Sequence, residues 1–134
     1  SGGEEEETVI IGSDTIVAMD GDILGKPADE EDAFRMLSDL SGRTHQVYTG
    51  VAIFLLKGGE IKKHLVFSEC TDVTMRKLDE EEIRDYIACG EPMDKAGAYG
   101  IQGKAAVFIS GISGDYYNVV GLPICRLTEM IKSL

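Results

Sequence analysis

The sequence predicts a mixed α/β fold that is built from β-hairpins and separate helices. Two dipeptides between apolar segments, Asp20-Gly21 and Gly58-Gly59, are typical of two-residue hairpin turns. The strand-rich stretches on either side of the second turn, 46–57 and 60–77, follow one another without a helix between them. Regular β-α-β alternation therefore fails in the middle of the chain, which argues against a doubly wound parallel sheet.

The first part of the chain divides into a lead-in and the start of the domain. Residues 1–8 contain Ser, Gly and a run of Glu, and we expect a flexible acidic lead-in to a domain at 9–134. Val9–Ile11 is a short apolar run that predicts a buried strand. Such a strand would place Asp14 at or just past its end, where ligand sites of α/β proteins often lie.

Three segments show helical patterns. Asp29 to Leu40 begins with a capping residue and an acidic first turn. Its apolar stripe, at helical spacing, contains Ala33, Met36, Leu37 and Leu40. Asp79 to Cys89 begins with a capping box, and its buried stripe is expected at Ile83, Tyr86 and Ile87. Pro123 is expected at the first position of a final helix that ends near Lys132.

The sequence also predicts a bulge in one strand segment and a central strand in another. Apolar alternation in 60–77 is incomplete, because Val66, Cys70 and Val73 are not in one phase. This predicts a bulge or bend near 68–71. The apolar segment 105–110 predicts a central strand.

Composition limits the class of protein. A chain of 134 residues with 43% hydrophobic and 28% charged residues is typical of one globular domain. The formal net charge of −11 argues against nonspecific binding to nucleic acid. No apolar run approaches the ~20 residues of a membrane span, and the acidic start is unlike a signal peptide. The cysteines match no zinc or redox pattern, which favours a reducing, cytoplasmic setting: Cys70, Cys89 and Cys125.

Segment 91–103 has the pattern of a ligand loop. Its glycines allow backbone N–H groups to approach a ligand closely. Lys95 supplies a charge for phosphate beside the anionic Asp94, and the amide of Gln102 can read a planar polar edge. The local pattern alone fits an ordinary Gly-rich turn equally well, so the choice between a ligand loop and a turn depends on other segments.

Four other motifs occur in a fixed order around this loop, at 12–17, 24–27, 40–51 and 114–123. They read Gly-Ser-Asp-Thr-Ile-Val, Leu-Gly-Lys-Pro, Leu-Ser-Gly-Arg-Thr-His-Gln-Val-Tyr-Thr-Gly-Val and Gly-Asp-Tyr-Tyr-Asn-Val-Val-Gly-Leu-Pro. With the loop, they make the chain closely resemble the Maf family of nucleoside triphosphate pyrophosphatases, from about Val9 to the C-terminus. The form of the loop, Lys-Ala-Gly-Ala-Tyr-Gly-Ile-Gln, resembles the subfamily that acts on dTTP, UTP and modified pyrimidine nucleotides.

The resemblance implies a fold and a reaction. The fold is an elongated mixed β-sheet flanked by helices, related to inosine triphosphatases. The reaction is hydrolysis of a nucleoside triphosphate between the α and β phosphates, which yields the monophosphate and pyrophosphate. A divalent cation, Mg²⁺ or Mn²⁺, would neutralise the phosphates.

The resemblance also implies roles for individual residues. Asp14 matches the aspartate regarded as the catalytic base, and it could bind the metal, whereas the local pattern alone also fits a turn-capping residue. Lys26, held beside Pro27, would stabilise charge that develops on the phosphates. Four residues would bind the substrate: Thr15, Asp94, Lys95 and Gln102. His45 is expected to be structural, and Asn118 to satisfy buried backbone groups.

The start of the chain departs from the family pattern. Family members begin with a strand and a Ser-x-Arg-Arg motif, and neither occurs here, so the resemblance is to an N-terminally truncated member. The chain could therefore be an enzyme, an impaired relative that serves as a nucleotide-binding or interaction module, or one fragment of a cleaved enzyme. A bare sheet edge would also permit a homodimer.

Overall fold

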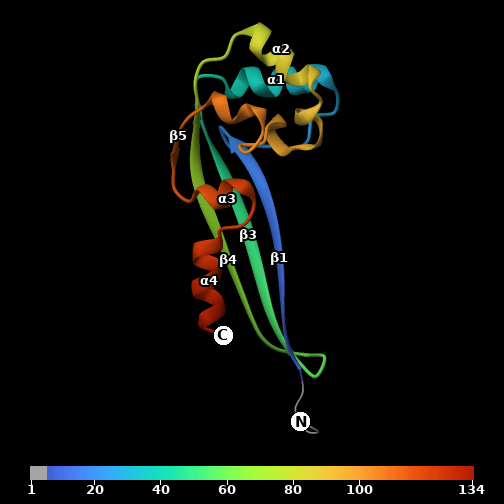
Figure 1. Ribbon diagram of the computed structural model, residues 1–134, viewed down its shortest axis with the longest axis vertical. Helices are drawn as coiled ribbons and strands as arrows, with labels where there is room; N and C mark the ends of the chain where they lie inside the picture. The colour runs from blue at the N-terminus through green and yellow to red at the C-terminus, as the bar shows by residue number, and fades with distance from the viewer. Residues whose placement is uncertain (1–5) are drawn as a thin grey trace.

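The computed structural model describes residues 6–134 as an elongated sheet with helices at one end and along one side (Figure 1). The strands are β1 (Glu7–Met19), β2 (Asp22–Leu24), β3 (Thr44–Lys57), β4 (Glu60–Met75) and β5 (Ile109–Ser113). The helices are α1 (Glu30–Leu40), α2 (Glu80–Ala88), α3 (Tyr116–Val120) and α4 (Ile124–Lys132). Short 3₁₀ turns cover Glu91–Asp94, Ala96–Ala98 and Lys104–Phe108. The predicted α/β class is confirmed.

The sheet has the order β2-β1-β3-β4-β5, and each of its four pairings is antiparallel. The family resemblance implied a mixed sheet, but the described strands contain no parallel pair. Both predicted hairpin turns are confirmed. Positive φ angles of 52° and 82° at Asp20 and Gly21, and of 61° and 80° at Gly58 and Gly59, suit the right-handed twist of the adjoining strands.

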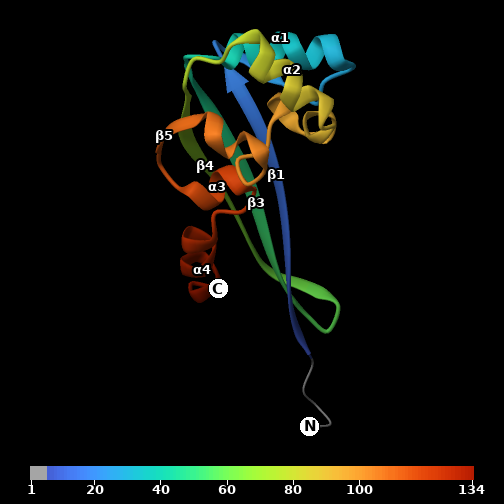
Figure 2. The same cartoon turned by 45° about the horizontal axis from the view of Figure 1, so that its top comes forward.

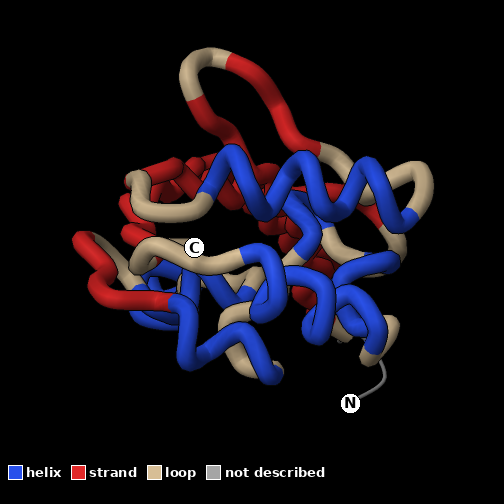
Figure 3. The backbone as a smooth tube through the Cα atoms, turned by 90° about the horizontal axis from the view of Figure 1, so that it is seen from above, coloured by secondary structure: helices blue, strands red, loops and turns tan. Residues whose placement is uncertain are grey.

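The helical end of the molecule has its own core, in which α1 and α2 pack with the 3₁₀ turns (Figure 2). The predicted stripe of α1 is buried, and so is that of α2. Asp29 caps α1 by accepting the Asp32 N–H, and Asp79 with Glu82 forms the predicted capping box. Seen from above, these helices lie in front of the strands and close the end of the sheet (Figure 3).

The two faces of the long strands differ. On one face α4 packs through Leu127 against Val51, Ile53 and Phe67. The other face, which we call the open face, leaves Ile10, Tyr48 and Val66 exposed. Directly paired residues share a face, so the pairing of Asp14 with Gly50, and of Gly50 with Ser68, places Asp14 on the open face.

Several sequence expectations are wrong in detail. The predicted strand at Val9–Ile11 is part of a strand that begins at Glu7 and continues to Met19, because Gly12 to Thr15 pair with β3 without interruption. Asp14 therefore lies within a strand and not at its end. Residues 1–5 of the predicted lead-in lie outside the described residues.

The register of β4 also differs from expectation. No shift occurs at 68–71; the shifts lie between Leu55 and Leu56 and between Thr74 and Met75. The alternation is in fact regular, since Thr71 is a buried polar residue in phase with Val73. Segment 105–110 is a 3₁₀ turn followed by the edge strand β5, not a central strand. The final helix starts at Ile124, with Pro123 as its cap.

Candidate active site

A cleft of about 580 Å³ lies where the helical end meets the sheet. Its apolar wall comes from β1, β3 and α3: Val17, Val47, Val119 and Val120. Its polar groups come from β1, the segment after β2 and the loop 91–103: Thr15, Lys26, Glu91, Lys95 and Gln102. One apolar wall opposite several convergent polar groups is typical of a small-ligand site.

The loop is tied to the segment that carries Lys26 by one backbone hydrogen bond, from the Gly97 N–H to the Gly25 carbonyl, 3.1 Å long. Gly97 has φ +72°, and a Cβ there would lie 2.9 Å from Cγ1 of Val17. Only glycine fits both the left-handed backbone and this close approach to β1. Ala98 also has a positive φ, 66°, a conformation that costs on the order of 1–3 kcal/mol in a non-glycine residue.

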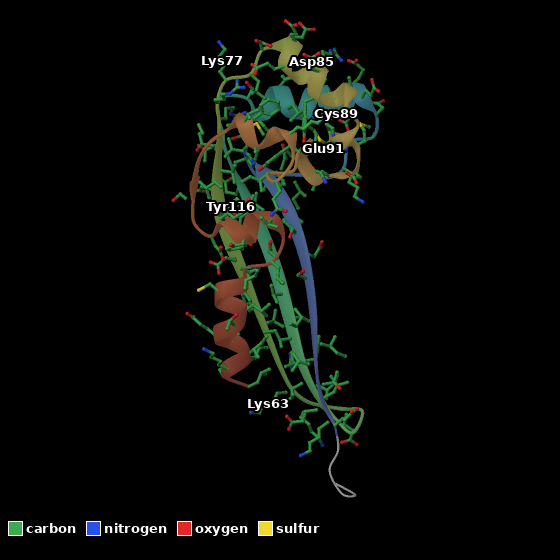
Figure 4. All side chains as sticks on the ribbon, viewed as in Figure 1. Lys63, Lys77, Asp85, Cys89, Glu91 and Tyr116 are labelled. Atoms are coloured by element: carbon green, nitrogen blue, oxygen red, sulfur yellow. The ribbon has the colours of Figure 1, made fainter. Side chains whose placement is uncertain are left out.

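Two other glycines make room for charged side chains. A Cβ on Gly100 would lie 2.8 Å from both Cδ and Cε of Lys95, so the lysine stem crosses directly over Gly100. A Cβ on Gly103 would collide with the carboxylate of Glu91. Glu91 Oε1 accepts the Lys104 N–H at 3.2 Å, whereas its Oε2 is buried and has no hydrogen-bond partner within residues 6–134. Figure 4 labels Glu91 at the helical end, close to Cys89.

The loop is anchored to the sheet by His45 and Tyr99. His45 Nε2 lies 2.6 Å from the Tyr99 hydroxyl, and the rings meet edge to face with centroids 5.4 Å apart. Burial lowers the pKa of His45 to about 4 and raises the pKa of Tyr99. His45 is therefore neutral near pH 7 and holds Tyr99, a residue of the cleft lining. The predicted structural role of His45 agrees with this contact.

A series of polar side chains fixes α3, which supplies part of the apolar wall. Asn118 Nδ2 donates to the Val47 carbonyl at 3.1 Å and to Thr71 Oγ1 at 2.9 Å. Thr49 Oγ1 donates to the Asn118 carbonyl at 3.1 Å and lies 2.9 Å from Thr15 Oγ1. Asn118 thus satisfies a buried backbone carbonyl, as the sequence predicts, and it joins the short helix α3 (Figure 1) to β3 and β4.

The cleft brings together four of the six site residues that the sequence predicts: Thr15, Lys26, Lys95 and Gln102. Asp14 and Asp94 are absent from its lining. Asp94 is exposed and lies 3.6 Å from Lys95 as an ion pair, whereas Asp14 is exposed on the open face. Sequence reasoning missed Glu91 and Tyr99 as cleft residues. Glu91 lies twelve positions before its partner glycine, and no local pattern indicates that they meet.

A metal site was expected at Asp14. Among residues 6–134, no group of three or more His, Cys, Asp or Glu side chains is placed to hold a metal ion. Within the same residues, no helix combines the length and apolar character needed to cross a membrane.

The fold and the cleft define an α/β protein in which two lysines, Lys26 and Lys95, line one cleft together with an apolar wall. The chain belongs to the Maf-like protein family, whose model matches residues 2–134. It is 58% identical over 130 residues to a dTTP/UTP pyrophosphatase of Agathobacter rectalis, covering 96% of this chain and 63% of that protein.

Two other relatives carry the same name. The dTTP/UTP pyrophosphatase of Clostridium acetobutylicum is 56% identical over 131 residues, covering 98% of this chain and 64% of that protein. That of Bacillus cytotoxicus is 55% identical over 127 residues, covering 95% and 64%. The chain therefore spans less than two thirds of the length of each of these relatives.

Proposed function

We propose that this chain carries the nucleotide site of a nucleoside triphosphate pyrophosphatase that acts on dTTP and UTP. One observation carries the proposal: Lys26 and Lys95, from segments far apart in the sequence, line one cleft with Gln102. In a chain with a net charge of −11, two ammonium groups in one cleft provide a local site for phosphates. The relatives named dTTP/UTP pyrophosphatase support the same reaction and the same substrates.

The proposed binding mode follows the order of groups in the cleft. Lys26 and Lys95 bind phosphate oxygens and stabilise the charge that develops on them during hydrolysis. Gln102 pairs with a carbonyl and an N–H of the base. The apolar wall formed by α3 receives the sugar and the face of the base, and it excludes water from them.

Asp14 is the candidate base of this proposal, although it lies outside the cleft. β2 pairs only with Val17 to Met19, so the described strands leave the outer edge of β1 unpaired beside Thr15. A triphosphate that crosses this edge would run from the lysines to the face that carries Asp14. There Asp14 would take the proton of the attacking water. Asp94 would hold Lys95 in place through its ion pair.

The divalent metal of the proposal would be shared with the substrate. Mg²⁺ is often held by one or two carboxylates together with phosphate oxygens and waters, and a lone carboxylate fits that mode. Asp14 would supply the protein ligand, and the ion would offset negative charge on the triphosphate. An arrangement of this kind needs no cluster of carboxylates before the nucleotide binds.

A binding module without catalysis is the second candidate, and the exposed position of Asp14 away from the cleft favours it. Product analysis in ¹⁸O-labelled water separates the two. We expect dTTP to yield dTMP and pyrophosphate, with the label in only one of the two products. Binding of dTTP without any product would support the module. Release of inorganic phosphate with dTDP would contradict the proposed bond of cleavage.

A further inference from the structure

The hydroxyl of Thr15 is the outer end of a series of hydrogen bonds that starts in the cleft. Thr15 lines the cleft and is half-buried, and its Oγ1 lies 2.9 Å from Oγ1 of Thr49. Thr49 is fully buried, and its Oγ1 donates to the Asn118 carbonyl at 3.1 Å. Two threonine hydroxyls therefore connect the cleft with the backbone of α3.

The direction of each hydrogen bond in this series can be assigned. A carbonyl only accepts, so the single proton of the Thr49 hydroxyl is directed at Asn118. Turning that proton toward Thr15 would leave the carbonyl of a buried residue without this donor. Thr49 thus accepts in its contact with Thr15, and Thr15 donates. The Thr15 proton is directed into the sheet, and only oxygen lone pairs remain for a ligand.

The surroundings of Thr15 Oγ1 leave room for a ligand group. Gly121 directly follows α3, and a Cβ built on it would lie 3.9 Å from Thr15 Oγ1. Apart from the residues on either side of Gly121, that Cβ would meet no other atom of residues 6–134 within 4 Å. Space is therefore open beside this oxygen at the end of α3, where the proposed binding mode places the sugar.

An acceptor at this position selects a donor on the ligand. Triphosphate oxygens are acceptors near neutral pH, and binding one here would break the bond from Thr15 to Thr49. The base pairs with Gln102 in the proposed mode. The other donors of dTTP and UTP are sugar hydroxyls, and the 3′-hydroxyl is the one that both nucleotides carry.

We propose that Thr15 is a specificity-determining residue that accepts the 3′-hydroxyl of the nucleotide. The proposal rests on the proposed function and names the sugar group that the site requires. A 3′-hydroxyl extends the series in one direction, from the ligand through Thr15 and Thr49 to the Asn118 carbonyl. Hydrogen bonds aligned in this way strengthen one another, so nucleotides that lack the 3′ donor bind more weakly.

Ligand analogues test the polarity of this contact on the wild-type chain, without depending on the folding of any variant. Calorimetry would give the dissociation constants of dTMP, 3′-deoxythymidine monophosphate and 3′-fluoro-3′-deoxythymidine monophosphate, none of which can release pyrophosphate. We expect both analogues to bind about fivefold or more weakly than dTMP, since hydrogen and fluorine cannot donate. A fluoro analogue that binds as tightly as dTMP would overturn the inference, because fluorine only accepts.

Variants connect this preference with Thr15. Thr15→Val removes the hydroxyl and keeps the shape, so the preference for dTMP over the 3′-deoxy analogue should disappear, whereas Thr15→Ser should retain it. Thr8→Val lies on the same strand outside the cleft lining and should leave the preference unchanged. If Thr15→Val weakens both nucleotides equally and keeps the preference, the role of Thr15 is only structural and the inference is overturned.

Failure of the inference and failure of the proposed function give different results. Equal binding of dTMP and the 3′-deoxy analogue to the wild-type chain would overturn the inference but leave the proposed function standing. If the wild-type chain binds neither dTTP nor dTMP, the proposed function falls, and the inference falls with it.

Discussion

The hydroxyl of Tyr99 lies 2.6 Å from Nε2 of His45, so the residue at the centre of the ligand loop is held by a buried histidine of β3. His45 Nδ1 has no hydrogen-bond partner within residues 6–134. A neutral imidazole tolerates this position because an unprotonated Nδ1 is only an unused acceptor. Protonation would create a buried charge and an unpaired donor at the same time.

The stability of the fold should therefore fall in acid because of His45. Its pKa is about 4 when folded and about 6.5 in the unfolded chain, so the unfolded state binds more protons between these values. This effect costs no stability above about pH 6.5; the stability lost grows as pH falls toward 4, where the loss reaches roughly 3 kcal/mol. Denaturant unfolding of His45→Gln from pH 4 to 7 should show a flatter pH profile than the wild type. The matched control is His64→Gln, at an exposed site on β4, which should leave the profile unchanged.

Gly100→Ala should separate binding from stability. The added Cβ displaces the flexible end of Lys95, so the melting temperature should change little. Loss of one charge-assisted phosphate contact should weaken dTTP binding by roughly 10- to 100-fold. In Gly97→Ala, the added Cβ would collide with Val17, and alanine would have to adopt a φ of +72°. We therefore expect the free energy of unfolding to fall by about 2 kcal/mol or more. Gly111→Ala, which meets no atom within 4 Å, is the control for both. Unchanged affinity in Gly100→Ala would show that the position of Lys95 does not matter.

Gln102→Ala should reduce the preference among bases more than it reduces the turnover of the best substrate. The amide lines the cleft and pairs with the base edge in the proposed mode. We expect the ratio of kcat/KM for dTTP and UTP over ATP and GTP to fall, while kcat on the best substrate falls less. An unchanged ranking of the four triphosphates would show that another residue reads the base.

Asp14→Asn tests the catalytic base. The side chain is exposed, so the melting temperature should stay close to that of the wild type. Pyrophosphate release should fall by at least ~10²-fold, the low end for general-base catalysis. Near-normal turnover would remove Asp14 from the mechanism and direct attention to groups within the cleft.

The open face and the unpaired edge of β1 suggest a test with more of the family sequence. Ile10, Tyr48 and Val66 are exposed together with this edge. We expect the 134 residues alone to bind nucleotide weakly and turn over slowly. The remaining third of a relative's length, fused or added in trans, should raise both activity and melting temperature by covering apolar surface. Full activity of the 134 residues alone would contradict this expectation.

Local patterns predicted α1, α2, α4 and both hairpins because their signals are short in range, whereas they did not predict α3. Asp29 and Asp79 cap helices by bonding to residues three positions further along the chain, and each turn dipeptide joins the two strands directly beside it. The strand that contains Asp14 extends further than the sequence predicts because residues 7–14 are exposed, so no alternation of buried and exposed positions marks them, and pairing with β3 is what continues the strand. A buried polar residue such as Thr71 likewise hides a regular alternation until its partner Asn118 is known.

The candidate site was predictable only in part. Lys26, Lys95 and Gln102 belong to motifs, and the fold brings them to one cleft. Glu91 could not be found from the sequence, since its approach to Gly103 depends on how two 3₁₀ turns pack. The burial of His45 depends equally on the distant Tyr99, 54 positions along the chain.

The hydrogen bond from Gly97 to Gly25 joins main chain to main chain, and it links the two segments that carry the lysines. The separation of the two backbone segments is thus set by main-chain atoms, while the position of the Lys95 ammonium group also depends on its contacts with Asp94 and Gly100. Substitutions of other cleft residues can then change which base is accepted, while the two segments that carry the lysines keep their separation. Substrate range and phosphate chemistry can consequently diverge independently during evolution, with Gly97 as the position that must not change.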